Sequence, residues 1–161
     1  MSHAKSLTID PELEAHIWQL LYSQFGIPKL AGYRFLKSGR KRIRLISNAA
    51  FALLSELPYT GTTGLYLGEY SPTAFRLSMD GAQLLGDHAT KQIVRLTARQ
   101  AEAWLRGESV NYEDDRRGYV IVTHNGTILG CGSISHGTLR SYVPKIRRPQ
   151  RQIGQSGEEN P

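Results

Sequence analysis

The asparagine–glycine pair at positions 125 and 126 constrains the fold more than any other feature of this sequence. Residues 119–123, before the pair, are valine, isoleucine and other residues that favour β-strands. Residues 127–129, after the pair, continue this strand-like composition. Asn-Gly is the dipeptide best suited to a two-residue hairpin turn. The sequence therefore predicts a β-hairpin within a longer stretch, residues 118–149, that ends in basic residues.

The second strand of this hairpin runs into the small residues Gly130-Cys131-Gly132. Glycine in a strand indicates that another backbone approaches closely or that the strand bends at a barrel corner. We therefore expect a compact β-module here, and the flanking glycines favour Cys131 as a small buried residue over an activated thiolate.

Basic residues gather in two segments that contain no Asp or Glu. Residues 15–55 hold seven Lys and Arg, and residues 116–157 hold seven more. The twelve acidic residues of positions 1–115 all lie outside the first segment, and the net charge of the chain is +6. Two basic segments separated by a mildly acidic one favour a polyanionic partner such as nucleic acid. The alternative is a solvated basic face on an ordinary small protein.

Length and composition set further expectations. The 161 residues suffice for one ordinary domain or two small ones, and a 40% hydrophobic fraction can build a core. One cysteine forms no disulfide within the chain and fits a reducing compartment. No apolar run approaches the roughly 18–20 residues of a membrane span. We expect a soluble, cytoplasmic protein with no membrane partner.

Local signals predict the elements of the first half. Asp10-Pro11 supplies an N-cap and a first-turn proline for a helix that Gly26 ends. A hairpin around Ser38-Gly39 joins residues 33–37 to residues 42–46, with Arg42 and Arg44 on one face and Ile43 and Leu45 on the other. A short helix follows over residues 49–57 and stops at Pro58.

The second half continues the alternation of strands and helices. The glycine-rich residues 61–68 lack the spacing of a phosphate loop and predict a turn followed by a strand. Strands are expected over residues 75–78 and 91–96, with a helix over residues 79–89 between them. Thr97 and Gln100 form a capping box for a helix that buries Ala101, Trp104 and Leu105 and ends at Gly107.

The sequence shows no set of catalytic or metal-binding residues at the spacing that such sites require. The histidines at positions 3, 16, 88, 124 and 136 have no metal-ligand spacing, and one cysteine cannot build a zinc site. The adjacent acids of residues 113–115 indicate a solvated loop better than a catalytic carboxylate pair. We expect a protein that is not an enzyme and that carries no cofactor and no metal.

The stretch 118–149 resembles the PUA domain, an RNA-binding domain named for pseudouridine synthases and archaeosine transglycosylases. The variant it is most similar to is the one found in RNA cytosine methyltransferases of the Nop/Sun family. The family's Tyr-Val-Leu-Val strand corresponds to residues 119–122 of this chain, and its Leu-Gly-x-Gly element corresponds to residues 129–132. Its basic ending corresponds to Leu139, Pro144, Lys145 and Arg148. Strand, turn and basic ending agree in order and spacing.

Upstream motifs resemble ribosome-assembly factors that carry a "pre-PUA" domain before the PUA domain. The segments involved are residues 64–68, 75–77, 91–95 and 104–110. The resemblance implies an α+β fold, with a pre-PUA-like α/β domain at residues 1–89 and a PUA-like β pseudo-barrel with short helices at residues 90–152. Residues 153–161 are expected to be a disordered tail.

The resemblance also implies where RNA docks, between the first PUA helix with its following loop and the last strand. Carried over by residue, the expected RNA-binding positions are Arg106, Gly107, Arg140, Lys145, Arg147 and Arg148. Gly107 would let the RNA backbone approach, and the cations would pair with phosphates. A second basic surface comprises Lys37, Arg40, Lys41, Arg42 and Arg44, which could contact RNA or a protein, or simply be solvated.

The sequence departs from the methyltransferases in lacking both their nucleotide-binding domain and their catalytic cysteine. We therefore expect a non-catalytic protein that recognises structured rRNA or tRNA in ribosome assembly or RNA modification. One alternative is a protein-interaction adaptor whose N-terminal domain binds a ribosome-assembly or RNA-modifying protein. The others are an accessory RNA-binding subunit of a separate RNA methyltransferase and an enzyme with an unrecognised site.

Overall fold

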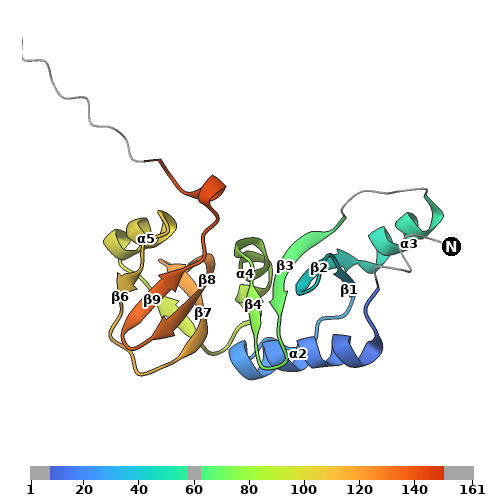
Figure 1. Cartoon of the computed structure of the whole chain (residues 1–161), viewed down its shortest axis with the longest axis horizontal. Helices are drawn as coiled ribbons and strands as arrows, with labels where there is room; N and C mark the ends of the chain where they lie inside the picture. Colours follow the sequence, from blue (N-terminus) through green and yellow to red (C-terminus); the bar gives the residue numbers. More distant parts are fainter. Residues whose placement is uncertain (1–7, 58–62, 151–161) are drawn as a thin grey trace, which may run out of the picture.

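The computed structural model of the chain describes residues 8–57 and 63–150 and contains two β-sheets (Figure 1). The expectations for Pro58, for the start of the glycine-rich turn and for the tail lie outside these ranges. Helix α4 lies between the two sheets and contacts β3 of the first and β8 of the second. Within the described residues, no helix is long and apolar enough to cross a bilayer.

The N-terminal sheet has the order β1-β2-β3-β4, and every neighbouring pair is antiparallel. Its elements are α2 (Pro11–Phe25), β1 (Tyr33–Lys37), β2 (Arg42–Ser47), α3 (Asn48–Glu56), β3 (Leu65–Tyr70), β4 (Phe75–Leu77) and α4 (Met79–Leu85). The Asp10 side chain accepts a hydrogen bond from Leu13 N at 2.8 Å, and Gly26 ends α2 in the left-handed region. The predicted caps of α2 and the β1–β2 hairpin are therefore confirmed.

The C-terminal sheet has the order β5-β7-β8-β9-β6 and curls into a half-barrel (Figure 1). Its elements are β5 (Ile93–Arg95), α5 (Ala98–Leu105), β6 (Val110–Asn111), β7 (Gly118–His124), β8 (Thr127–Ser135), β9 (Thr138–Ser141) and the 3-10 turn η2 (Lys145–Arg147). Strand β5 runs parallel to β7, whereas the other pairs are antiparallel. The predicted α+β class with a PUA-like pseudo-barrel is confirmed.

The hairpin predicted from Asn125 and Gly126 joins β7 to β8. The two turn residues have φ of 47° and 76°, the left-handed values that this turn requires. After the turn, Gly130 and Gly132 lie against the indole of Trp104; a Cβ on Gly130 would come within 3.0 Å of that ring. A Cβ on Gly132 would lie 2.7 Å from the backbone oxygen of Arg140, so the close backbone approach expected here is present.

Three local predictions needed correction. The helix expected over residues 79–89 ends at Leu85 and continues as a 3-10 turn, η1 (Gly86–His88), because Ala89 N bonds to Gly86 O. The strand expected over residues 91–96 is shortened to β5, because Gln92 has a φ of 57° that leaves the extended region. Leu105, expected to be buried, is only half-buried at the end of α5.

The hydrophobic core of the described residues consists of two clusters. The larger cluster packs α2 and α4 on the N-terminal sheet, and it also includes Ile121 from β7 and Cys131 from β8. The smaller cluster surrounds Trp104 inside the C-terminal sheet. Because strands of the second sheet contribute to the core of the first, the two halves of the chain are packed together. A domain boundary at residues 89–90 stays a prediction.

Candidate nucleic-acid interface

Arg148 and Gly107 are brought together at the end of α5. Gly107 has a φ of 89°, and a Cβ built on it would lie 2.3 Å from Cζ of Arg148. Arg148 is held there because its Nε donates to Val143 O at 3.1 Å. Any residue with a side chain at position 107 would be strained and would displace this guanidinium. The space that was expected to admit an RNA backbone at Gly107 therefore contains the Arg148 guanidinium.

The other cations of the C-terminal group differ in how far their charge is already compensated. Arg106 forms ion pairs with Glu102 at 2.9 Å and Glu108 at 3.3 Å. Arg147 pairs with Asp80 of α4 and keeps a side-chain exposure of 45%. Lys145 is exposed in η2. The guanidinium of Arg140 lies 5.2 Å from the Tyr142 ring centroid.

These contacts favour some of the expected phosphate-binding positions over others. Arg106, with two carboxylates beside it, is the weakest candidate, because a phosphate would have to compete with both. Lys145, Arg147 and Arg148 follow one another closely after β9, and Arg148 lies beside Gly107 at the end of α5. This group, hereafter the η2 basic surface, consists of Lys145, Arg147 and Arg148. A role in RNA contact for each residue stays a prediction.

The cations of the second basic surface, at the β1–β2 hairpin, differ in their contacts and exposure. Arg44 donates to the backbone oxygens of Thr63 and Gly64, so its guanidinium fastens the approach to β3. Arg42 turns toward the other half of the chain, with its guanidinium 5.8 Å from the Tyr66 ring centroid. Lys37, Arg40 and Lys41 are exposed at and beside the hairpin turn. The structure thus separates Arg44, which is held by backbone oxygens, from the four exposed cations Lys37, Arg40, Lys41 and Arg42.

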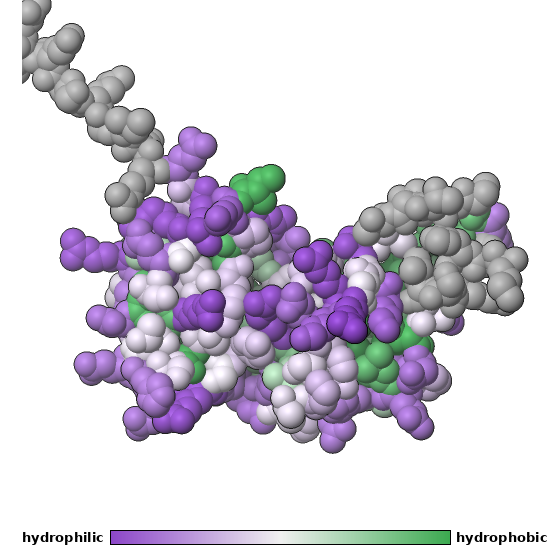
Figure 2. All heavy atoms as spheres, viewed as in Figure 1, coloured by the Kyte–Doolittle hydropathy of each residue, from purple (hydrophilic) through white to green (hydrophobic). Residues whose placement is uncertain are grey.

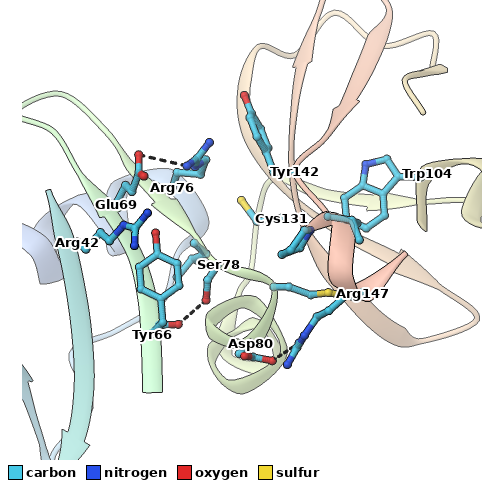
Figure 3. Close-up of a pocket in the computed structure, with 14 residues that line it drawn as sticks. Arg42, Tyr66, Glu69, Arg76, Ser78, Asp80, Trp104, Cys131, Tyr142 and Arg147 are labelled. Carbon is cyan, nitrogen blue, oxygen red and sulfur yellow. Dashed lines mark hydrogen bonds and ion pairs between the residues drawn. The ribbon is translucent and has the colours of Figure 1, made fainter. Parts of the chain in front are cut away.

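A pocket of about 250 Å³ lies between the two sheets (Figure 3). The N-terminal half supplies Arg42, Tyr66, Glu69 and Arg76 to its lining, and the C-terminal half supplies Trp104, Tyr142 and Arg147. In the space-filling view, hydrophilic residues border the hollow between the halves (Figure 2). The pocket therefore joins one residue of the second basic surface to one residue of the η2 basic surface.

Sequence analysis missed Tyr66, Arg76 and Tyr142 as members of a site. Arg76 forms an ion pair with Glu69 at 3.1 Å, and its guanidinium lies 4.6 Å from the Tyr142 ring centroid. The apolar–cation–apolar alternation of Phe75, Arg76 and Leu77 is a signal that could have placed Arg76 outside the core, where the structure has it half-buried. No sequence signal indicated that it meets Tyr142, which lies 66 positions further along the chain.

Cys131 is the residue on which a covalent RNA-modifying mechanism would depend, and it is buried with 3% exposure. Burial raises the pKa of the thiol to about 12 from its usual 9.0. The thiol therefore stays protonated at neutral pH and is a poor nucleophile. The expectation of a small buried residue rather than an activated thiolate is confirmed.

The native protein should accordingly resist the thiol reagent DTNB at pH 8, and labelling should proceed only as fast as the protein opens. Because the folded pKa lies above the unfolded one, this group favours the folded state below pH 9 and loses that contribution as the pH rises further. Labelling rates with and without denaturant provide the measurement. Fast labelling of native protein, at the rate of a small free thiol, would contradict the burial of Cys131.

The acidic loop at residues 113–115 is organised by a neighbouring arginine. Arg116 donates from Nε and Nη2 to the Asp114 carboxylate at 2.9 and 2.7 Å. These hydrogen bonds lower the pKa of Asp114. Arg116 also donates to Ile93 O at 3.0 Å, which ties the loop to β5.

Across the described residues, no group of three or more His, Cys, Asp or Glu is arranged to hold a metal ion.

Comparison with known proteins finds similarity in the C-terminal part of the chain. Residues 91–148 match the family model described as the methyltransferase RsmF PUA domain. Two curated relatives, both named ribosomal RNA small subunit methyltransferase F and both from Vibrio vulnificus (strains YJ016 and CMCP6), are 26% identical over 101 residues. The match covers 63% of this chain and 21% of each relative, so it spans about a fifth of their length. The PUA resemblance predicted from the β7–β8 motifs is confirmed.

Proposed function

We propose, from the premise that residues 91–148 form a PUA domain of the RsmF type, that the chain is a non-catalytic RNA-binding protein. Its substrate class is structured rRNA or tRNA, and its role lies in ribosome assembly or RNA modification in the cytoplasm. The name of the relatives, a methyltransferase of small-subunit ribosomal RNA, favours rRNA. The buried, protonated Cys131 argues against a thiolate mechanism within this segment.

One observation carries this proposal: after β9, three cations lie within the four residues 145–148, with Arg148 beside Gly107 at the end of α5, in a segment that matches the PUA domain of an RNA-modifying enzyme. The guanidinium of Arg148 lies over Gly107. Its Nε donates to Val143 O, and its two Nη atoms form the end of the side chain. Guanidinium groups pair well with phosphate because their fork of donors matches two oxygens. Such contacts recognise the shape of a folded RNA more than its base sequence.

The N-terminal half, residues 1–89, is proposed to be a pre-PUA-like domain that orients the PUA domain. The packing of Ile121 and Cys131 into the N-terminal core supports this role, since the two halves then present their surfaces at a fixed angle. Lys37, Arg40 and Lys41, which are exposed at and beside the β1–β2 turn, would extend the positive field toward RNA that is bound at η2.

The adaptor alternative has one observation in its favour. Leu53 and Leu57, on and just after α3, are 57% and 53% exposed, and exposed large apolar side chains suit a protein partner. A protein that is recovered with the full chain but lost with Leu53→Ser, while RNA affinity stays unchanged, would favour this role. The accessory-subunit alternative predicts that the recovered partner is itself an RNA methyltransferase.

Binding of the purified full chain to rRNA and tRNA fragments across a salt series tests the main proposal. We expect the logarithm of the affinity to fall linearly with the logarithm of salt, by about 0.7–0.9 per phosphate contact. Three cations in the η2 basic surface imply a slope of at least about 2. Affinity that does not change with salt would contradict a phosphate-binding surface, and an absence of binding to every fragment would contradict the function.

A further inference from the structure

The pocket between the two sheets combines aromatic rings with cations from both halves of the molecule (Figure 3). Tyr66 projects from β3, and Tyr142 follows β9 on the opposite side. Both rings are half-buried, so part of each remains accessible from the pocket. Aromatic rings that remain accessible in a positively charged groove are the arrangement with which proteins bind unpaired nucleic-acid bases.

Each ring has a guanidinium close to it. Arg42 lies 5.8 Å from the Tyr66 centroid, whereas Arg76 and Arg140 lie 4.6 Å and 5.2 Å from the Tyr142 centroid. A guanidinium in these positions can stack on a base or contact the phosphate beside it. The pocket thus offers both kinds of contact that a nucleotide makes, to its ring and to its phosphate.

The charges in the pocket leave a net positive balance. Arg42, Arg76 and Arg147 supply three positive charges, Glu69 and Asp80 supply two negative ones, and the difference is one positive charge. Both carboxylates are already paired, Glu69 with Arg76 and Asp80 with Arg147. Burial, and secondarily the charge of Glu69, raises the pKa of Tyr66, so its hydroxyl stays protonated and can donate to a base.

We propose that this pocket receives one unstacked base of a single-stranded segment of the bound RNA, with the flanking phosphates on Arg42 and on the η2 basic surface. This inference rests on the proposed RNA-binding function and adds a site to it. Leu77, Met79 and Val143 line the pocket beside the rings, and such apolar area suits the face of a base rather than a phosphate. Arg147 lines the pocket and also belongs to the η2 basic surface, so the two sites are continuous.

The test compares two probes that present phosphates but differ in access to their bases. One is a fluorescein-labelled single-stranded RNA of about ten nucleotides, within the range that a small β-domain covers. The other is the blunt duplex of the same strand with its complement, in which the bases are stacked and paired. Fluorescence anisotropy titrations with the full chain give the affinity for each probe.

Replacing Tyr142 by alanine should weaken binding of the single strand about tenfold, since one base–aromatic stack is lost. Affinity for the duplex should change less than about twofold, because no phosphate contact is removed. Tyr142→Phe keeps the ring and should stay within about twofold of the wild type for both probes. Tyr66→Ala tests the opposite wall of the pocket and should behave as Tyr142→Ala does.

A matched control accounts for the structural contacts of Tyr142. Its hydroxyl lies 3.1 Å from Ser133 Oγ, so Ser133→Ala removes this hydrogen bond and leaves the ring in place. We expect Ser133→Ala to bind both probes as the wild type does. Thermal unfolding of each variant identifies any that fails to fold, and in that case Tyr66→Ala carries the test instead.

Abasic substitution locates the base. In the wild type, one abasic position of the single strand should cost about tenfold in affinity, whereas in Tyr142→Ala the same position should cost nothing further. Equal losses for strand and duplex in Tyr142→Ala, or no loss for either, would overturn the base pocket while leaving RNA binding intact. If the wild type binds neither probe nor any structured RNA, the proposed function itself is overturned.

Discussion

Replacing Arg147 and Arg148 together by alanine should lower the affinity of the protein for structured RNA on the order of a hundredfold. Each guanidinium that contacts a phosphate through a charge-assisted hydrogen bond contributes about 1.5 kcal/mol or more, and the two contributions add to about 3 kcal/mol. The salt dependence should become shallower by about 1.4–1.8, because two phosphate contacts are lost. Titrations of wild type and variant over a salt series measure both effects.

A matched variant separates specific contacts from net charge. Lys91→Ala with Arg99→Ala removes the same two charges from the same half of the chain, and both residues are exposed. We expect only a several-fold loss from the weaker long-range field. A loss as large as that of the Arg147 and Arg148 variant would contradict the assignment of phosphate contacts to the η2 basic surface.

The conservative exchange of both arginines for lysine tests the geometry. Lysine keeps the charge but lacks the planar fork, and it cannot reproduce the contact of Arg148 Nε with Val143 O over Gly107. The salt dependence should then match the wild type, while the affinity falls to an intermediate value. Full wild-type affinity would show that point charge alone suffices at these positions.

Local chemistry made much of this fold predictable from the sequence. The Asp10 cap, the capping box of Thr97 and Gln100 and the turn at Asn125-Gly126 all act over a few residues, and all are present as expected. These signals fix where elements begin and end because the hydrogen-bonding groups that they satisfy are close in the sequence. The order of the elements from α2 to the β7–β8 hairpin, apart from β6, followed from such local signals.

Long-range pairing could not be predicted in the same way. Strand β6 has two residues and pairs with β9, which is also short, so neither carries a pattern that distinguishes it from a loop. The pocket unites Arg42 with Arg147, which are 105 positions apart, and depends on the packing of α4 between the sheets. A family resemblance supplied the η2 basic surface; it covered the segments that contain Tyr66 and Arg76 but implied no role for either residue.

Replacing Trp104 by alanine should have the largest effect on stability. The side chain is 1% exposed at the centre of the C-terminal core cluster, and its indole N–H donates to Arg140 O at 3.3 Å. Truncation of a buried tryptophan costs about 3–5 kcal/mol through lost burial and the cavity that remains. This loss is a large part of the 5–15 kcal/mol that stabilises an ordinary domain, and the midpoint of thermal unfolding should fall by roughly 6–20 °C. Circular dichroism during heating measures it, with Trp104→Phe as a milder control.

The same variant shows whether the two halves unfold together. The chain has two tryptophans, so in Trp104→Ala the fluorescence comes from Trp18 alone, which is buried in the N-terminal cluster. Because Ile121 and Cys131 pack into that cluster from β7 and β8, loss of the C-terminal sheet would expose it. Trp18 fluorescence and circular dichroism should therefore change at the same lowered temperature. A Trp18 transition that stays at the wild-type temperature would show that the N-terminal half is stable without its partner, and the pocket between them would then lack the fixed geometry that base binding requires.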